Sequence, residues 1–204
     1  MRFYDSVGPN PHVVRMAAAE KGVTLDTIKI DILAGENRQS DYSAKVPSGG
    51  TPALALDNGL VLSEVTALSE YLDEIGSGPS IIGATPEERC ETRMWVRRID
   101  LGYVEPMANG FRAAEGRPMF APRMTLMDAE GAAQLKAMAR EKLLWLDGLL
   151  AGRQWVCGDR FTLADILLYC FVKFGATVGQ PAPAEAAWVA QWCTRVSQRP
   201  SAKA

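Results

Sequence analysis

The chain has few cysteines and no excess of charge of either sign. Four cysteines occur among 204 residues, all of them after residue 77 and none in a Cys-x-x-Cys pair. This usage argues against a zinc site and against a disulfide framework. The formal net charge is -2, so the basic excess that binding to a phosphate backbone requires is also missing. We therefore expect no metal site and no nucleic-acid partner.

Long apolar runs are missing as well. No uninterrupted stretch approaches the roughly 20 residues that span a bilayer. The strand-like segment Arg2-Phe3-Tyr4 stands where a signal peptide would need an apolar core. Hydrophobic residues make up 48% of the chain and charged residues 23%, which is typical of a globular protein. We expect a cytoplasmic protein without a membrane partner.

The first 75 residues alternate between strand and helix patterns. Phe3-Tyr4 is typical of a short strand, and the apolar spacing over 10–21 predicts a helix that Gly22 ends. The segment 27–32 alternates apolar and polar residues with the period of two that marks a strand. These three elements form a βαβ unit.

A hairpin and a helix are predicted next. Asn58-Gly59 separates the apolar runs 53–56 and 60–62, and this dipeptide is a strong hairpin signal. After the hairpin, apolar residues at helical spacing predict a helix with one buried face; they are Val65, Leu68, Leu72 and Ile75. The predicted order is therefore βαβ followed by ββα.

A change of pattern marks a domain boundary. The segment 76–79, Gly-Ser-Gly-Pro, interrupts the alternation, and only helical periodicity follows it. We expect a first α/β domain over 1–77, a linker over 78–85 and an all-helical domain over 86–204. Helices in the second domain are indicated by Trp95, Ile99 and Tyr103, by Met138, Leu146 and Leu149, and by Trp188, Trp192 and Val196.

Thr162 and Asp165 predict the start of a buried helix. Their spacing fits a capping box in which each side chain bonds the main-chain N–H of the other residue. The following residues are apolar around most of the helix circumference, so we expect the helix to be buried on most sides.

Three motifs together give the chain a family resemblance. They are Gly50-Thr51-Pro52-Ala53-Leu54 with Asn58-Gly59, the stretch 62–68 leading to Tyr71-Leu72, and Phe161-Thr162-Leu163-Ala164-Asp165. In this order and spacing the chain resembles the glutathione S-transferase family over nearly its whole length. The resemblance implies a thioredoxin-like domain followed by a helical domain, glutathione as co-substrate, and a homodimer.

The resemblance also implies where glutathione binds. Pro52 would follow a cis peptide bond that turns the main chain of Thr51 toward the cysteinyl part of glutathione; the alternative is a proline that simply begins a strand. Glu64 would hold the γ-glutamyl ammonium, or remain a solvated residue near a helix N-terminus. Val65 keeps a main-chain donor but lacks the serine hydroxyl common in the family. Lys45 would reach the glycyl carboxylate, or remain a free surface lysine.

Activation of the thiol is the least determined part of the resemblance. Many members carry Cys or Ser at the position of Gly8, which here has no side chain, so a mixed disulfide on the protein is excluded. Asn10 is the first candidate donor, with helix capping as its alternative role. Ser6 and Tyr4 are the other candidates, although an aromatic residue at the end of a strand more often serves packing. We assign no role to His12.

The resemblance implies a glutathione transferase that attacks a small hydrophobic electrophile, as in detoxification. Tyr103, Met107 and Phe111 would line the electrophile site, and core packing explains the same spacing. Two alternatives stay open: a glutathione-dependent disulfide or peroxide reductase that uses no protein cysteine, and a non-catalytic binding module. Charge is uneven, near -5 up to residue 77 and near +3 beyond it. This asymmetry favours a charge-complementary homodimer.

Overall fold

The structure, a computed structural model, describes residues 1–204 and divides them into two compact units. The first unit contains residues 1–84 together with 199–204, and the second contains residues 85–198. None of the helices is both long enough and apolar enough to cross a membrane.

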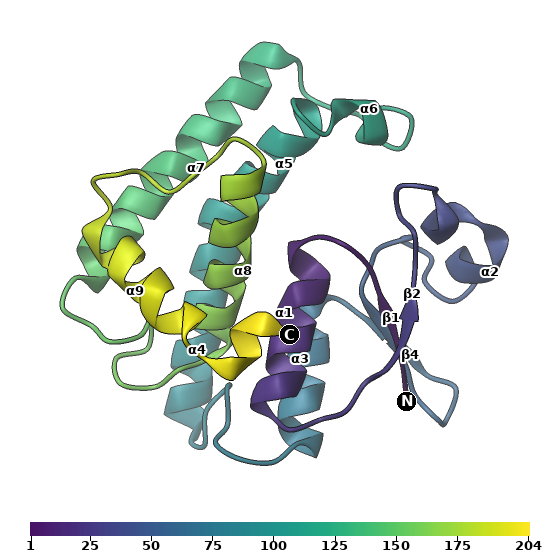
Figure 1. Ribbon diagram of the computed structural model, residues 1–204, viewed down its shortest axis with the longest axis horizontal. Coiled ribbons are helices and arrows are strands. Elements are labelled where there is room, and N and C mark those ends of the chain that lie inside the picture. The colour runs from purple at the N-terminus through teal and green to yellow at the C-terminus, as the bar shows by residue number, and fades with distance from the viewer. The chain divides into compact units, whose positions relative to one another are not determined.

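A four-stranded sheet forms the centre of the first unit (Figure 1). Its strands lie in the order β2-β1-β3-β4, in which β1 pairs parallel with β2 and antiparallel with β3, and β3 pairs antiparallel with β4. Phe3 and Leu54 face each other across the two central strands and are both fully buried. The strands are β1 (Arg2–Asp5), β2 (Asp26–Lys29), β3 (Ala53–Ala55) and β4 (Val61–Ser63).

Two helices cover one side of this sheet, and short helical turns lie on the other side (Figure 1). The covering helices are α1 (Pro9–Glu20) and α3 (Val65–Ile75), which pack against each other. The short turns are η1 (Glu36–Arg38) and α2 (Ser40–Ser43), in the polar segment before β3. The observed order confirms the predicted βαβ-ββα arrangement.

The end of the chain returns to the first unit. The turn η3 (Pro200–Lys203) packs beside α1, where Figure 1 places the C-terminus. The residues after α3 also belong to this unit, because Lys21 Nζ lies 3.2 Å from the Gly78 carbonyl oxygen and 3.0 Å from the Pro79 carbonyl oxygen. The first unit therefore includes residues 78–84, which the sequence assigns to a linker over 78–85 after a first domain over 1–77. It also includes residues 199–204, which the sequence assigns to the helical domain over 86–204.

Helices alone form the second unit. A continuous helical run comprises α4 (Pro86–Ile99), the π-helical segment η2 (Asp100–Val104) and α5 (Glu105–Ala113). Pro106 explains the π-helical segment, because proline cannot donate the next regular hydrogen bond. The other helices are α6 (Arg117–Phe120), α7 (Ala129–Leu150), α8 (Leu163–Thr177) and α9 (Ala187–Ser197).

The predicted capping box at the start of α8 is confirmed. The Thr162 N–H donates to the Asp165 carboxylate at 2.9 Å, and the reciprocal bond is also present. Asp165 has no exposed surface and also accepts hydrogen bonds from Val156 N–H and Trp192 Nε1, both at 2.9 Å. This carboxylate therefore joins the loop before α8, α8 itself and α9.

Candidate functional site

Gly8 sets the geometry of the loop that joins β1 to α1. It is the N-cap residue of α1 and has φ 110° and ψ 175°, a conformation that L side chains rarely adopt. A Cβ atom added to Gly8 would meet no atom within 4 Å, so backbone conformation rather than lack of space favours glycine. A Cys or Ser nucleophile at this position would therefore be strained.

Asn10 supplies the donors at the start of α1. Its neighbours Pro9 and Pro11 have no N–H group, so Asn10 carries the only main-chain N–H among the first three helical residues. No side chain caps the helix, which removes the capping alternative for Asn10. The side chain is half-buried. The main-chain N–H and the side-chain amide of Asn10 therefore both stand at the positive end of the helix dipole.

Ser6 and Tyr4 are held by contacts within the first unit. The Ser6 hydroxyl donates to the Ile30 carbonyl at 2.7 Å, so its proton is already engaged. The Tyr4 side chain is 8% exposed, and its ring meets that of Tyr42 edge-on with centroids 5.7 Å apart. Both placements favour structural roles, and the roles of these two residues toward a thiol stay predictions.

The peptide bond between Thr51 and Pro52 is cis, as predicted. Pro52 is buried directly before β3, and Thr51 is half-buried. No hydrogen bond to the Thr51 main chain is present among the turn and loop bonds of the chain. The N–H and C=O of Thr51 therefore have no main-chain hydrogen-bond partner within the protein.

Two polar side chains that sequence reasoning missed support the loop before Thr51. Asn37 Nδ2 donates to the Gly49 carbonyl at 2.6 Å, and the Tyr42 hydroxyl donates to the Gly50 carbonyl at 2.6 Å. Burial, and then the neighbouring Tyr4, raises the pKa of Tyr42 to about 12, so this phenol keeps its proton at neutral pH. Both residues lie in a segment whose sequence predicts only a polar loop.

Glu64 is the only residue other than glycine with a positive φ, at 72°. It is the N-cap residue of α3, yet its side chain caps nothing and is exposed to solvent. Backbone strain of this kind persists where the surrounding structure enforces it, and it is often found at ligand sites. Val65 follows as the first residue of α3 and is half-buried.

Lys45 is an exposed residue whose ammonium group bonds the Asp41 carbonyl, one turn earlier in the chain. The structure therefore places the amine on its own helical turn, and an anion would have to compete with that carbonyl.

The three residues predicted for the electrophile lie in the second unit with unequal exposure. Tyr103 is 3% exposed and Met107 is fully buried, so both belong to the helical core. Phe111 is half-buried, and its ring contacts those of Phe120 and Phe174, with centroid distances of 6.1 and 5.1 Å. Only Phe111 thus has appreciable exposed surface, and the electrophile role of all three stays a prediction.

Comparison with known proteins covers both units. Residues 7–75 match the family described as glutathione S-transferase, N-terminal domain, and residues 119–200 match the glutathione S-transferase, C-terminal domain. The chain is 33% identical to glutathione S-transferase 2 of Saccharomyces cerevisiae, over 100% of this chain and 88% of that protein. The chain belongs to the glutathione S-transferase family. Glutathione is the co-substrate of this family, and the thioredoxin-like and helical domains are those expected from the sequence.

Solved structures agree with this assignment. A glutathione S-transferase domain-containing protein of Marinobacter aquaeolei superposes with a TM-score of 0.92 at 34% identity, covering 99% of this chain and 100% of that chain. Gtt2 from Saccharomyces cerevisiae gives a TM-score of 0.92 at 32% identity, with 100% and 99% covered. This chain therefore shares its fold with these two proteins over nearly its full length.

Proposed function

We propose that this protein is a glutathione transferase whose bound thiolate adds to, or displaces a group from, a small hydrophobic electrophile. The single observation that carries the proposal is the strained backbone of Glu64 at the start of α3. Glu64 is the only residue between β4 and α3, and because its side chain is exposed and caps nothing, no side-chain contact within the protein is a reason for this conformation. A ligand held by the side chain and by the following N–H groups gives one.

Each part of glutathione has a proposed partner in the first unit. The Thr51 main chain pairs with the cysteinyl residue, and Glu64 binds the γ-glutamyl ammonium. The Val65 N–H binds the γ-glutamyl carboxylate at the positive end of α3. Lys45 binds the glycyl carboxylate. Since Val65 has no hydroxyl, one hydrogen bond worth about 1 kcal/mol is missing, which weakens glutathione binding without abolishing it.

Asn10 is the proposed donor to the sulfur. A cysteine-type thiol has a pKa near 8.5 and is mostly protonated at neutral pH, so the site must stabilise the anion. The N–H and amide of Asn10 and the dipole of α1 supply that stabilisation without a titrating group. The thiol proton leaves to solvent, and the thiolate attacks the electrophile. Ser6 and Tyr4 remain the alternative donors.

Retention on immobilised glutathione, followed by two turnover assays, tests the proposal. The protein should bind the resin and conjugate a chloronitrobenzene-type electrophile. Retention with reduction of a small disulfide but no conjugation would instead identify a reductase that uses glutathione alone. Retention without either turnover would identify a non-catalytic binding module, an alternative that Gly8 and Val65 favour because each lacks a polar side chain common in the family. Failure to bind glutathione would contradict both enzymatic functions.

We further propose a cytoplasmic homodimer that acts in detoxification, with Tyr103, Met107 and Phe111 on the electrophile side. Support for a dimer comes from large apolar side chains exposed on the second unit, namely Met94, Leu101, Met138, Trp145 and Leu149. Counted by the observed units, the net charge is -3 for the first unit and +1 for the second. Because the charges are opposite, a monomeric mass by sedimentation equilibrium at low salt would contradict the charge-complementary dimer.

A further inference from the structure

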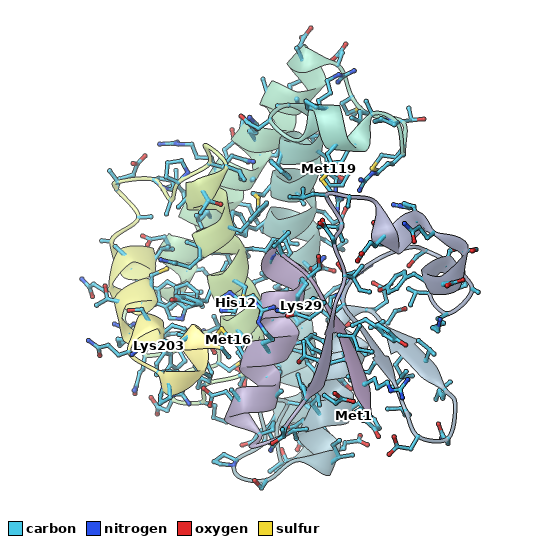
Figure 2. All side chains as sticks on the ribbon, turned by 45° about the vertical axis from the view of Figure 1, so that its right-hand side comes forward. Met1, His12, Met16, Lys29, Met119 and Lys203 are labelled. Carbon is cyan, nitrogen blue, oxygen red and sulfur yellow. The ribbon has the colours of Figure 1, made fainter.

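A buried carboxylate lies directly before the loop that carries Gly8. Asp5 is the last residue of β1 and has no exposed surface. Its Oδ1 lies 2.5 Å from Arg15 Nη1 on α1, and its Oδ2 bonds Lys29 Nζ at the end of β2. In Figure 2, Lys29 is labelled close to the helix that carries His12 and Met16. Asp5 thus joins β1, β2 and α1.

Asp5 and Arg15 lie on either side of the candidate thiol site in the sequence. Asp5 precedes the loop of residues 6–8, and Arg15 lies in the second turn of α1, ten residues after Asp5. The Ile30 N–H donates to the Asp5 carbonyl at 2.8 Å, and the Ser6 hydroxyl donates to the Ile30 carbonyl. These main-chain contacts fix the strand side of the loop to the sheet. The contact with Arg15 then sets where the first turns of α1 stand relative to that strand.

Stability alone does not explain a charged pair at this place. Removing a carboxylate from water is costly, and well-packed apolar residues of similar volume often give equal or greater stability than a buried ion pair. The single hydrogen bond from Arg15 Nη1 to Asp5 is directional, because a planar guanidinium restricts the angle at which its N–H groups meet a carboxylate, whereas an ammonium group does not. A directional link is useful where the orientation of a helix end matters.

We propose that Asp5 and Arg15 are positioning residues for the thiol site, which orient the first turn of α1 so that Asn10 faces the glutathione sulfur. The inference rests on the proposed function, because it assigns these residues to the same site. Neither residue contacts the reacting sulfur. Their effect is exerted through the position of Asn10, so it should appear in the thiol pKa and in kcat rather than in the affinity for glutathione.

Two substitutions of Arg15 separate geometry from charge. Arg15→Lys keeps the positive charge but loses the planar guanidinium group, and Arg15→Gln removes the charge. The proposal expects both variants to raise the pKa of bound glutathione by about one unit, which is about tenfold less thiolate at neutral pH. kcat should fall in proportion, with the KM for glutathione unchanged. A pKa that moves in Arg15→Gln but not in Arg15→Lys would show a purely Coulombic role and overturn the proposal.

Asp73→Asn provides a matched control at the other end of α1. Asp73 pairs with Lys21 at 3.1 Å, and both side chains are at least nine-tenths buried. This variant should lose stability to an extent comparable with that of the Arg15 variants but leave the thiol pKa unchanged. An equal pKa shift in Asp73→Asn would show that general loosening of the fold, and not the Asp5–Arg15 pair, moves the sulfur. That result would also overturn the proposal.

Hydrogen exchange of the ligand-free protein gives a second readout that needs no glutathione. In Arg15→Lys the amides of residues 12–14 should exchange about tenfold faster than in the wild type, while those of α3 keep their rates. Unchanged rates in residues 12–14 would overturn the proposal. If the wild type binds no glutathione, the proposed function fails, and the exchange rates still decide whether this pair holds the first turns of α1.

Discussion

Glu20 and Arg199, which lie 179 positions apart in the sequence, form a bidentate ion pair. Arg199 Nε lies 2.8 Å from Glu20 Oε1 and Nη2 lies 2.7 Å from Oε2, while Ser201 also donates to this carboxylate. Glu20 ends α1, so the last six residues of the chain are held against the helix that carries the candidate thiol site at its other end. The C-terminal segment is therefore part of the first unit.

Arg199→Lys should destabilise the protein by about 1–3 kcal/mol, because the two-pronged bond is lost and the half-buried carboxylate keeps only part of its hydrogen bonding. Arg140→Lys is a suitable control, since Arg140 and Glu185 form an exposed pair whose loss should change stability by less than about 0.5 kcal/mol. Urea unfolding monitored by circular dichroism measures both changes. Equal stabilities of the two variants would contradict the role assigned to Glu20 and Arg199.

The same pair predicts a pH dependence. Burial alone raises the pKa of Glu20, but the hydrogen bonds from Arg199 and Ser201 and the charge of Arg199 hold this pKa below its ordinary value. A carboxyl group with a lowered folded-state pKa stabilises the fold above its unfolded-state pKa and loses that contribution as the pH falls. The wild type should therefore lose more stability than Glu20→Gln between neutral pH and pH values below 4.5. Urea midpoints that change equally with pH in the wild type and in Glu20→Gln would contradict this prediction.

Asn10→Ala should retain glutathione but raise the pKa of its thiol by about one unit, because one of the two donors of Asn10 to the sulfur is lost. Protein stability should stay within about 0.5 kcal/mol of the wild type, since the Asn10 side chain caps no helix. Ultraviolet absorbance of bound thiolate across pH provides the measurement. Full thiolate formation in Asn10→Ala would remove the side chain of Asn10 from the mechanism.

Glu64→Gly should weaken glutathione binding by at least about tenfold while leaving stability equal or higher, because glycine adopts the positive φ without strain. Glu64→Gln is the matched variant, since it keeps the strain and removes only the charge. Binding by isothermal titration and thermal unfolding of both variants separate these effects. A loss of stability in Glu64→Gly together with unchanged binding would contradict the proposed ligand role of Glu64.

Asp165 predicts a pH effect of the opposite sign in the second unit. Burial raises the pKa of Asp165 from 3.8 to about 6, although Val156, Trp192 and Thr162 donate hydrogen bonds to it. Because the folded-state pKa is raised, its stabilising contribution is present in acid and lost as the pH rises through about 6. The difference between the folded-state and the unfolded-state pKa corresponds to about 3 kcal/mol of stability. This contribution should disappear in Asp165→Asn, which should also be less stable at pH 7 because its amide nitrogen faces an N–H donor. Urea unfolding of the wild type and of Asp165→Asn between pH 4 and 7 tests this prediction. Identical pH profiles of stability would contradict it.

Local patterns predicted most of the fold. Alternation over 27–32 and the Asn58-Gly59 turn were sufficient for the βαβ-ββα order, and the spacing of Thr162 and Asp165 was sufficient for the capping box. Helical periodicity did not always identify the buried face. Met138 and Leu149 accompany Leu146 in the apolar spacing of α7, yet they are 55% and 43% exposed, while Leu146 is fully buried.

Contacts between distant residues account for what the sequence did not predict. Asn37 and Tyr42 lie in a polar segment, and only the folded chain brings them under Gly49 and Gly50. The return of residues 199–204 to α1 has no local signal either, because Glu20 and Arg199 are ordinary charged residues in the sequence. The candidate site was predicted where a motif lies within a few residues, and missed where support comes from elsewhere.

The pKa of the glutathione thiol bound to the wild-type protein tests the central claim most directly. Ultraviolet absorbance of the thiolate across pH measures it, with free glutathione as the reference. The account predicts that binding lowers this pKa by at least about one unit from a free value near 8.5, because the start of α1 and Asn10 stabilise the anion. Bound glutathione that titrates like free glutathione would contradict the account.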